Sequence, residues 1–131
     1  MNDQQIESEI QAKGLTAPRV TPADIEANIK AEIFFTALDG AAEAAGDARS
    51  HHNRVKDDAD VADVHQALRL LTFCVLVLKN GFTVTGESAC VSPENFDAEM
   101  GRKIAHQNAV NKIWPLMGYA LQQRLHEGSE G

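Results

Sequence analysis

The chain has 131 residues, of which 44% are hydrophobic and 24% are charged, and its formal net charge is -7. This length and composition predict one globular domain with a sizeable core and exclude an intrinsically disordered chain. The negative charge excludes a nucleic acid polymer as partner, because binding one requires a broad basic face that neutralises phosphates. No apolar run approaches the ~20 residues that cross a bilayer, and no secretory signal opens the chain, so we expect a cytoplasmic protein that binds no membrane.

The first part of the chain is predicted to be an arm over residues 1–20 and a helix over residues 21–38. Within the arm, Gln4 to Lys13 form a short helix. Thr21 offers an N-cap hydroxyl, and Pro22 suits the first position of a helix. Apolar side chains then recur at helical spacing, which predicts an amphipathic helix that includes Ile25, Ile29, Ile33 and Phe34.

Residues 39–60 form a variable acidic segment whose structure the pattern does not determine. Seven acids stand against three bases between Asp39 and Asp63, which is typical of a solvated connection or the tip of a helical hairpin. His51 and His52 lie here, but adjacent histidines do not share one face, and the nearby acids lack the spacing of a calcium loop. We therefore expect no metal site.

Residues 61–127 are predicted to be the core, made of a helix, a β-hairpin and two further helices. Two strands, Thr72 to Lys79 and Phe82 to Ser88, flank the hairpin signal Asn80-Gly81. A two-residue turn at this signal would set Val77 opposite Val84. In this register one face is the core face, with Phe73, Val75, Val77, Phe82 and Val84, and the other carries Cys74, Leu76 and Leu78 beside Thr83, Thr85 and Glu87.

That second face is half apolar, and a lone hairpin is marginally stable in water. We expect helices to cover one face of the hairpin, and another strand or a second copy of the protein to cover the other, so that the protein self-associates through this face or through the long helix that follows. In the same register Cys74 and Cys90 point to opposite faces, so we expect no disulfide between them. The fold class is α+β, an antiparallel hairpin flanked by several helices.

The helix after the hairpin is predicted to begin at Ser92-Pro93 and to end or kink at Trp114-Pro115, because proline clashes with the preceding turn. A last helix follows. A polar stripe runs along the first of these helices at steps of three and four residues, namely Asn95, Glu99, Arg102 and His106. Gly101 on the same helix would allow another backbone to approach closely.

No motif in the sequence indicates catalysis. A nucleophile elbow, a phosphate loop and a dinucleotide fingerprint are all absent, and no base is placed against a nucleophile. We therefore expect a non-enzymatic protein without a cofactor.

Two stretches carry a family resemblance, and together they cover about half of the chain. The segment LTFCVLVLKNGFTVTGESACVSPENFDAEMGRKIAHQNAVNKIWPLMGYAL resembles the signature of a widespread family of small tailed-phage and prophage proteins. The earlier APRVTPADIEANI is similar to the amino-terminal signature of the same family. The family in turn is similar to the Thoeris anti-defence proteins, oligomeric sponges that trap cyclic nucleotide immune signals.

The resemblance implies a small phage protein that acts in the cytoplasm of the infected bacterium and sequesters a cyclic ADP-ribose-type or cyclic oligonucleotide signal without turnover. From the residues, we expect Phe82 to stack on a base, Asn95 to form hydrogen bonds, and Arg102 with Lys103 to bind phosphate, with His106 beside them. One alternative is an inhibitor that docks its acidic segment on a basic host enzyme. Another is a minor structural or assembly role in the phage.

Overall fold

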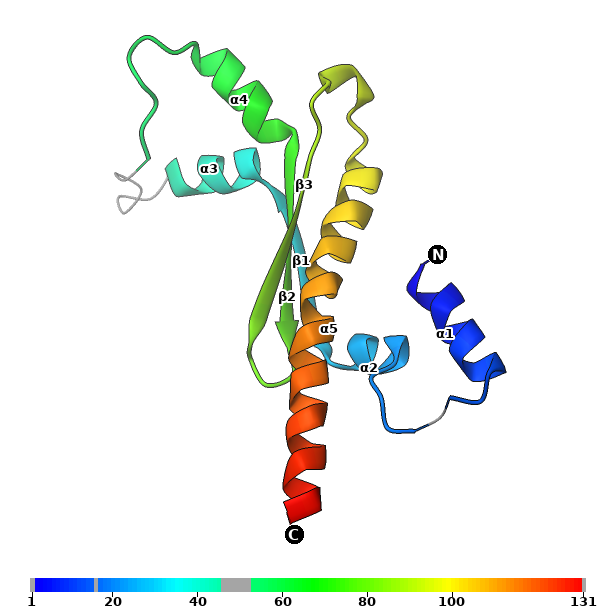
Figure 1. Ribbon diagram of the computed structural model, residues 1–131. Helices are drawn as coiled ribbons and strands as arrows, with labels where there is room; N and C mark the ends of the chain where they lie inside the picture. The colour runs from blue at the N-terminus through cyan, green and yellow to red at the C-terminus, as the bar shows by residue number, and fades with distance from the viewer. Residues whose placement is uncertain (1, 16, 46–52, 131) are drawn as a thin grey trace.

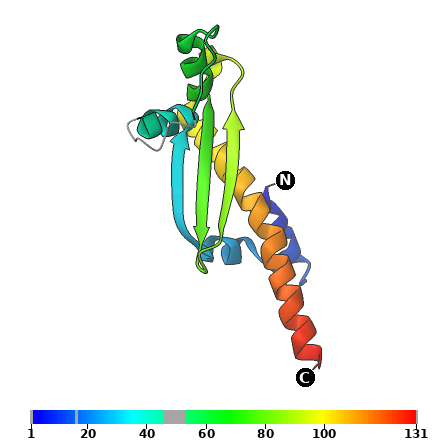
Figure 2. The same cartoon turned by 90° about the vertical axis from the view of Figure 1, so that its left-hand side faces the viewer.

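The computed structural model describes residues 2–15, 17–45 and 53–130. Its centre is a three-stranded antiparallel sheet of β1 (Ile29–Thr36), β2 (Leu71–Leu78) and β3 (Thr83–Ala89) in the order β1-β2-β3. A long helix, α5 (Ala98–Glu130), crosses one face of the sheet over β2 and β3 and continues beyond it (Figures 1 and 2). The predicted α+β class, an antiparallel hairpin with flanking helices, is confirmed.

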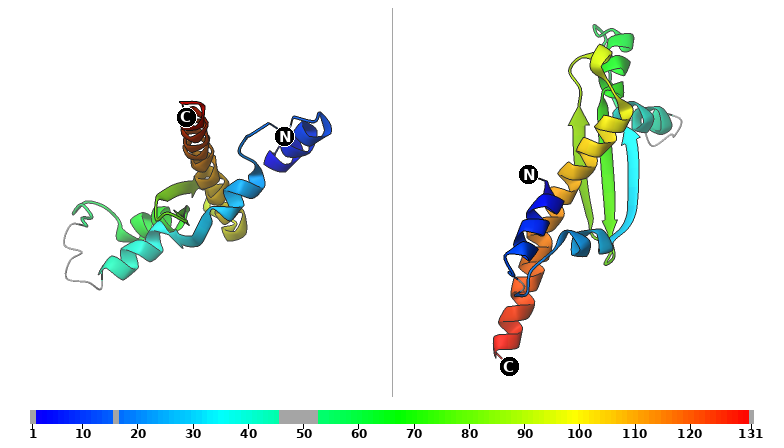
Figure 3. Two further views of the ribbon diagram at one scale, coloured as in Figure 1. Left: turned by 90° about the horizontal axis from the view of Figure 1, so that it is seen from below. Right: turned by 90° about the vertical axis from the view of Figure 1, so that its right-hand side faces the viewer.

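The amino-terminal arm holds the predicted short helix, α1 (Asp3–Ala12), which lies beside α5 on the side away from the sheet (Figure 3). Arg19 binds it through two parallel hydrogen bonds, from Nη1 to Oε1 of Glu7 at 2.6 Å and from Nη2 to Oε2 at 2.7 Å. Glu7 is only 8% exposed. The two hydrogen bonds therefore tie the end of the arm, at Arg19, to helix α1.

The predicted helix over residues 21–38 is wrong beyond its first two turns. Helix α2 (Pro22–Ala27) begins as expected, with Thr21 as its N-cap, but the chain then forms strand β1. Residues four apart lie on one face of a helix and equally on one face of a strand, so the spacing of Ile25, Ile29 and Ile33 suits both. Pairing with β2 decides for the strand, because β2 would otherwise lack a partner at one edge.

The hairpin is confirmed, but its register differs by one residue from the prediction. Val77 pairs with Thr83 and Leu76 with Val84, and the Leu78 amide donates to the Phe82 carbonyl at 2.8 Å. The loop therefore has three residues, and its last, Gly81, takes the positive φ of 91° that such loops need before the returning strand.

The one-residue shift places Val84 on the face of Leu76 instead of that of Val77, so the core face of β2 is the opposite of the predicted one. The buried side chains of the hairpin are Cys74 at 0%, Leu76 at 0%, Leu78 at 3% and Val84 at 7% exposure. They pack against α5 through its own buried stripe, which consists of Ala105, Ala109, Val110 and Ile113. The face predicted to need a second copy is thus covered within one chain, and α5 leaves the opposite face, with Phe73, Val75 and Val77, uncovered.

Gly86 sets how closely α5 approaches the sheet. A Cβ atom at this position would collide with the Ala105 carbonyl oxygen and the Ala109 amide nitrogen, and would lie 3.0 Å from the Ala109 Cα. The helix backbone therefore rests directly on the β3 backbone, and Ala105 and Ala109 are both fully buried at 0% exposure. This is the close approach that the sequence analysis assigned to Gly101, whose own Cβ would instead meet the Thr72 side chain at 3.1 Å.

Two predictions about the helices around the sheet also need correction. Ser92-Pro93 starts only a 3₁₀ turn, Pro93–Asn95, and α5 begins at Ala98 with Asp97 accepting a hydrogen bond from the Met100 amide at 3.1 Å. Helix α5 then runs unbroken through Pro115 to Glu130. Asn111, whose carbonyl loses its helical partner at Pro115, is exposed, so water can take that partner's place.

The described residues of the acidic segment lie in a projection from the end of the sheet, which α4 completes (Figure 1). Helix α3 (Ala37–Ala45) follows β1 directly, and α4 (Val61–Arg69) leads into β2. The described part between them, residues 53–60, is exposed and without regular structure, and Asp60 caps α4 through the Ala62 amide at 2.8 Å. Residues 46–52, with His51 and His52, lie outside the described residues.

Candidate functional site

A pocket lies where β1 ends and where both α3 and α5 begin. We call it the Arg102 pocket, and it encloses about 160 Å³. The residues that line it come from four separate parts of the chain and are Phe34, Phe35, Thr36, Asp39, Thr72, Phe96, Ala98 and Arg102. Three of these residues are phenylalanines, so one arginine faces a largely aromatic wall.

Two helix starts border the Arg102 pocket. At α3, Thr36 and Asp39 cap each other, with the Thr36 amide donating to Oδ2 of Asp39 at 2.9 Å and the Asp39 amide donating to Oγ1 of Thr36 at 3.1 Å. At α5, Asp97 caps the first turn, and Ala98 lines the pocket. The first turns of both helices therefore border the same space, and the carboxylates that cap them offset part of the positive partial charge there.

Arg102 itself has no hydrogen bond or ion pair with any other described residue. Asp39 shares the pocket, but its carboxylate accepts from the Thr36 amide. The guanidinium therefore keeps its five donors for a ligand or for water.

A second pocket of about 160 Å³ lies on the other side of Thr72 and Phe96, and we call it the Asn95 pocket. Its walls are formed by the ends of β2 and β3, the 3₁₀ turn and the first turns of α5, and its lining includes Asn95, Cys90, Met100 and Ile104. The guanidinium of Arg69 lies over the Phe96 ring at 5.6 Å. The ring is thus held in place by a cation–π contact between the two pockets.

The structure brings together only part of the predicted binding set. Asn95 and Arg102 line neighbouring pockets that share Phe96. Lys103 lines neither pocket and pairs with Glu99 at 3.3 Å on the exposed side of α5. His106 lies one turn further along the helix, with Nε2 at 3.6 Å from Oε1 of Glu32.

Phe82 lies far from the predicted phosphate-binding residue Arg102 of the same chain. It lies at the hairpin loop with 55% of its surface exposed, while Arg102 lies beside Thr72 at the other end of β2. At about 3.4 Å per residue, the six steps from Thr72 to Leu78 put roughly 20 Å between these two ends. Phe82 therefore cannot stack on a ligand that the Arg102 of the same chain binds.

Sequence reasoning missed the residues that complete the site. Phe96 was not among the predicted site residues, Asp39 was interpreted only as part of an acidic segment, and Phe34 as a helical position. The pocket became visible only once β1 was placed beside β2, which brings the ends of both strands to the start of α5.

Two larger hollows are less suited to a specific ligand. The one between α3 and α4 encloses about 570 Å³ and is lined mainly by alanine, leucine and valine. The one between α1, α2 and α5 encloses about 290 Å³, and its charged pair, Glu7 and Arg19, is already joined by two hydrogen bonds.

The remaining chemistry-bearing groups of the described chain do not assemble into a centre. Within residues 2–15, 17–45 and 53–130, no three histidine, cysteine or acidic side chains gather where an ion would bind. Cys74 is buried and Cys90 half-buried, and both are free thiols. None of the helices in this part of the chain combines the length and apolar character that crossing a membrane requires.

Comparison with known proteins gives one finding. The sequence profile of the phage protein (N4 Gp49/phage Sf6 gene 66) family matches residues 20–125. No curated protein and no solved structure matches the chain.

Proposed function

Because the chain belongs to this phage protein family, we propose that it is a small phage-encoded, non-enzymatic binding protein that sequesters a cyclic nucleotide signal of host immunity inside the infected cell. One observation supports the proposal above the others. Arg102 is exposed and unpaired among the described residues, and it lines a pocket together with three phenylalanines.

Arg102 is the group of the pocket that suits a phosphate, while the Asp39 carboxylate in the same pocket is already held by the Thr36 amide. A planar guanidinium can give two parallel hydrogen bonds to phosphate oxygens, and the starts of α3 and α5 add positive partial charge. A net charge of -7 repels anions in general, so a local arginine of this kind is needed for any anionic ligand.

The rings suit a nucleobase. Phe96 lines both pockets, and since the Arg69 guanidinium lies over one face of its ring, the other face can serve as the stacking surface. Base stacking on an aromatic ring contributes ~1–3 kcal/mol per base, and Asn95 beside the ring supplies both a donor and an acceptor for a base edge.

The size of the site indicates how a dinucleotide would bind. Each pocket encloses about 160 Å³, whereas ligand sites usually measure roughly 300–1,000 Å³. A cyclic nucleotide would therefore occupy both pockets across Phe96, or would extend onto a second copy of the protein. In the second case, Phe82 of another copy is free to act as the remote ring that the sequence analysis expected.

Isothermal titration calorimetry with a panel of cyclic ADP-ribose-type and cyclic oligonucleotide ligands tests the proposal. We expect one ligand to bind, to be recovered with unchanged mass, and to bind ~10- to 100-fold more weakly to Arg102→Gln, since a charge-assisted hydrogen bond is worth ~1.5–3 kcal/mol. Arg124→Gln, on the exposed end of α5, is the matched control and should bind like the wild type. No heat with any ligand, or equal affinity for Arg102→Gln, refutes the proposal.

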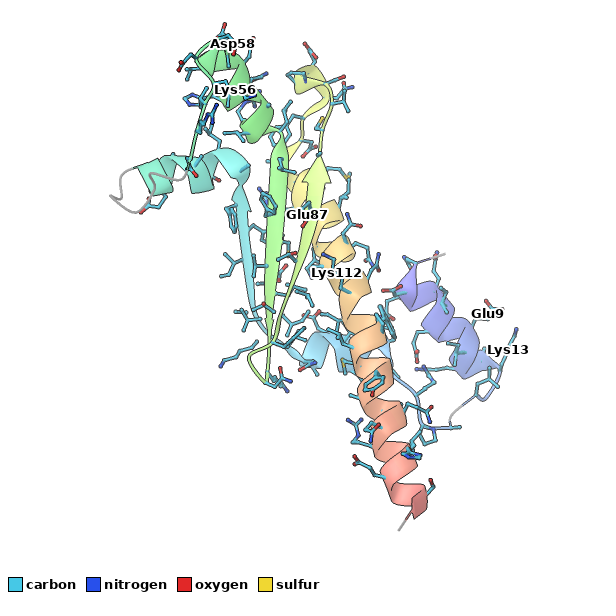
Figure 4. All side chains as sticks on the ribbon, turned by 60° about the vertical axis from the view of Figure 1, so that its left-hand side comes forward. Glu9, Lys13, Lys56, Asp58, Glu87 and Lys112 are labelled. Atoms are coloured by element: carbon cyan, nitrogen blue, oxygen red, sulfur yellow. The ribbon has the colours of Figure 1, made fainter. Side chains whose placement is uncertain are left out.

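A second candidate, an acidic inhibitor of a host enzyme, is favoured by the projection of α3 and α4. Figure 4 shows Lys56 and Asp58 at its outer end, where Asp57 and Asp58 are both exposed. Pull-down from host lysate with Asp57→Asn/Asp58→Asn separates the two functions, because loss of a salt-sensitive protein partner supports inhibition. Asp60 is left unchanged because it caps α4.

A further inference from the structure

The outer edge of β1 is open up to the residue at which α3 begins. β1 is a terminal strand of the sheet, and α5 packs on β2 and β3 instead. Figure 2 and the right-hand view of Figure 3 both show β1 at one side of the sheet, with α3 projecting past this edge only where β1 ends. Apart from the Thr36 amide, which donates to Asp39, the outward amide and carbonyl groups of β1 are therefore available to another strand.

The other edge strand, β3, differs from β1 because side chains of α5 contact it. Asn108 donates from Nδ2 to the Glu87 backbone carbonyl on β3 at 2.8 Å, and Lys112 lies with Nζ at 3.4 Å from Oγ1 of Thr85. Figure 4 shows Lys112 and Glu87 on these neighbouring elements. Strand addition at β3 would have to break the hydrogen bond from Asn108 to the Glu87 carbonyl, whereas at β1 the described residues place a side-chain hydrogen bond on the Thr36 amide alone.

Features that discourage strand addition lie in the first half of β1, where Glu32 is an exposed charge on the face of the sheet that carries α5. Lys30 is exposed, and the register shifts between Ile29 and Ala31. From Ala31 to Thr36 the pairing with β2 is regular, and the exposed side chains on the open face are apolar, with Ile33 at 50% and Phe35 at 36%.

We propose that the β1 edge is an interface at which a second copy of the chain adds its own β1 in antiparallel orientation, joining two sheets into one of six strands. The charge of β1 does not oppose a second copy at this edge. Two copies that each carry a net charge of -7 repel each other, but β1 holds one lysine and one glutamate and is neutral. When β1 pairs antiparallel with β1 of a second copy, a two-fold axis relates the two copies. This pairing uses the β1 edge of both copies, so the assembly ends at two.

The register follows from the pairing rules. Residues directly opposite each other in antiparallel strands point their side chains to the same side of the sheet. When β1 pairs with β1 of a second copy, the two-fold axis must therefore pass beside a residue that lies opposite the same residue of the other copy. An axis at Glu32 would oppose two carboxylates, which is destabilising. An axis at Phe34 would run Ala31 against Ala37, where β1 has already ended. An axis at Ile33 keeps Ala31 to Phe35 paired within the regular stretch and buries two half-exposed isoleucines against each other.

Disulfide trapping tests both the interface and its register. In a Cys90→Ser background, Ile33→Cys should form a covalent dimer under mild oxidation, because directly opposed residues have Cα atoms ~4.5–5.5 Å apart, within the range of a disulfide. Phe35→Cys is the matched control on the same face. Its thiol would face Ala31 of the other copy and lie roughly 13 Å from its equivalent, so it should remain uncoupled.

Sedimentation of the protein without ligand completes the test. The wild type should be a dimer, Ile33→Lys should be a monomer with a native circular dichroism spectrum, and Val61→Lys, a half-exposed valine on α4, should remain a dimer. A monomeric wild type at 100 µM, or cross-linking of Phe35→Cys as fast as Ile33→Cys, overturns the proposal. Neither experiment includes a nucleotide, so the result is independent of the proposed function.

Discussion

Replacing Gly86 by alanine tests the contact on which the whole packing of α5 depends. The added methyl carbon would overlap the Ala105 carbonyl oxygen and the Ala109 amide nitrogen, which are backbone atoms and cannot rotate away. Ordinary contacts require about 3.4 Å, so the helix must move away from β3 by roughly 1 Å. A gap of that size forfeits about a quarter to a half of each dispersion contact across the interface.

The cost can be estimated from what faces α5 at this point. Overpacking a well-packed core costs ~1–3 kcal/mol and occasionally more. Here we place it at the upper end, about 3–4 kcal/mol, because fully buried Leu76 and Ile113 lie in the same core and lose contacts together. Alanine recovers only ~0.5–1 kcal/mol by restricting the unfolded chain. The net loss of about 3 kcal/mol is a large part of the ~5–15 kcal/mol that holds a typical domain.

Urea denaturation followed by circular dichroism measures the loss. With a slope of ~1–3 kcal/mol per molar urea, Gly86→Ala should lower the midpoint by roughly 1–3 M. Gly118→Ala is the control, because its Cβ meets no atom within 4 Å and alanine favours a helix by about 1 kcal/mol. Adding Ala105→Gly should not rescue the variant, since the collision involves backbone. A loss below ~1 kcal/mol for Gly86→Ala would refute the reasoning.

Three further properties follow from single residues. Burial raises the pKa of the Cys74 thiol to about 11, so a thiol reagent at pH 8 should label Cys90 in the native protein and both cysteines only after unfolding; rapid labelling of both contradicts this burial. The hydrogen bonds from Arg19 lower the pKa of Glu7 from 4.5 to about 2, so the stability from this pair is complete above pH 4.5 and is lost as the pH falls toward 2. Melting temperatures of the wild type and Arg19→Gln should therefore converge over that range, and a constant gap would show that the pair does not titrate as described. Pro115→Ala restores a missing helical hydrogen bond and should stabilise the protein by about 1–3 kcal/mol in thermal unfolding; a loss of stability would mean that the proline supports packing that alanine cannot.

Local patterns in the sequence were sufficient for features that depend on neighbouring residues. The hairpin at Asn80-Gly81, the Thr21-Pro22 helix start and the short helix of the arm all appear where they were predicted. Each depends on backbone conformations and hydrogen bonds that close within a few residues, so nearby residue types determine them.

The candidate site was predictable only in part for the same reason. Asn95 and Arg102 were identified from their spacing on one helix face, which is a local property. Their aromatic partners were not, because Phe34 and Phe96 are far apart in the chain and meet only through the pairing of β1 with β2.

Where the local sequence pattern was compatible with two structures, tertiary contacts decided between them. A helix and a strand both place Ile29 and Ile33 on one side, and only the vacant edge of β2 made this stretch a strand. The two faces of β2 are both apolar, and the hairpin register with the bare backbone of Gly86 determined that α5 covers the face of Leu76. The sequence by itself thus determined the elements whose hydrogen bonds are local, while the choice of core face, and with it the position of the pocket, required contacts between residues distant in the chain.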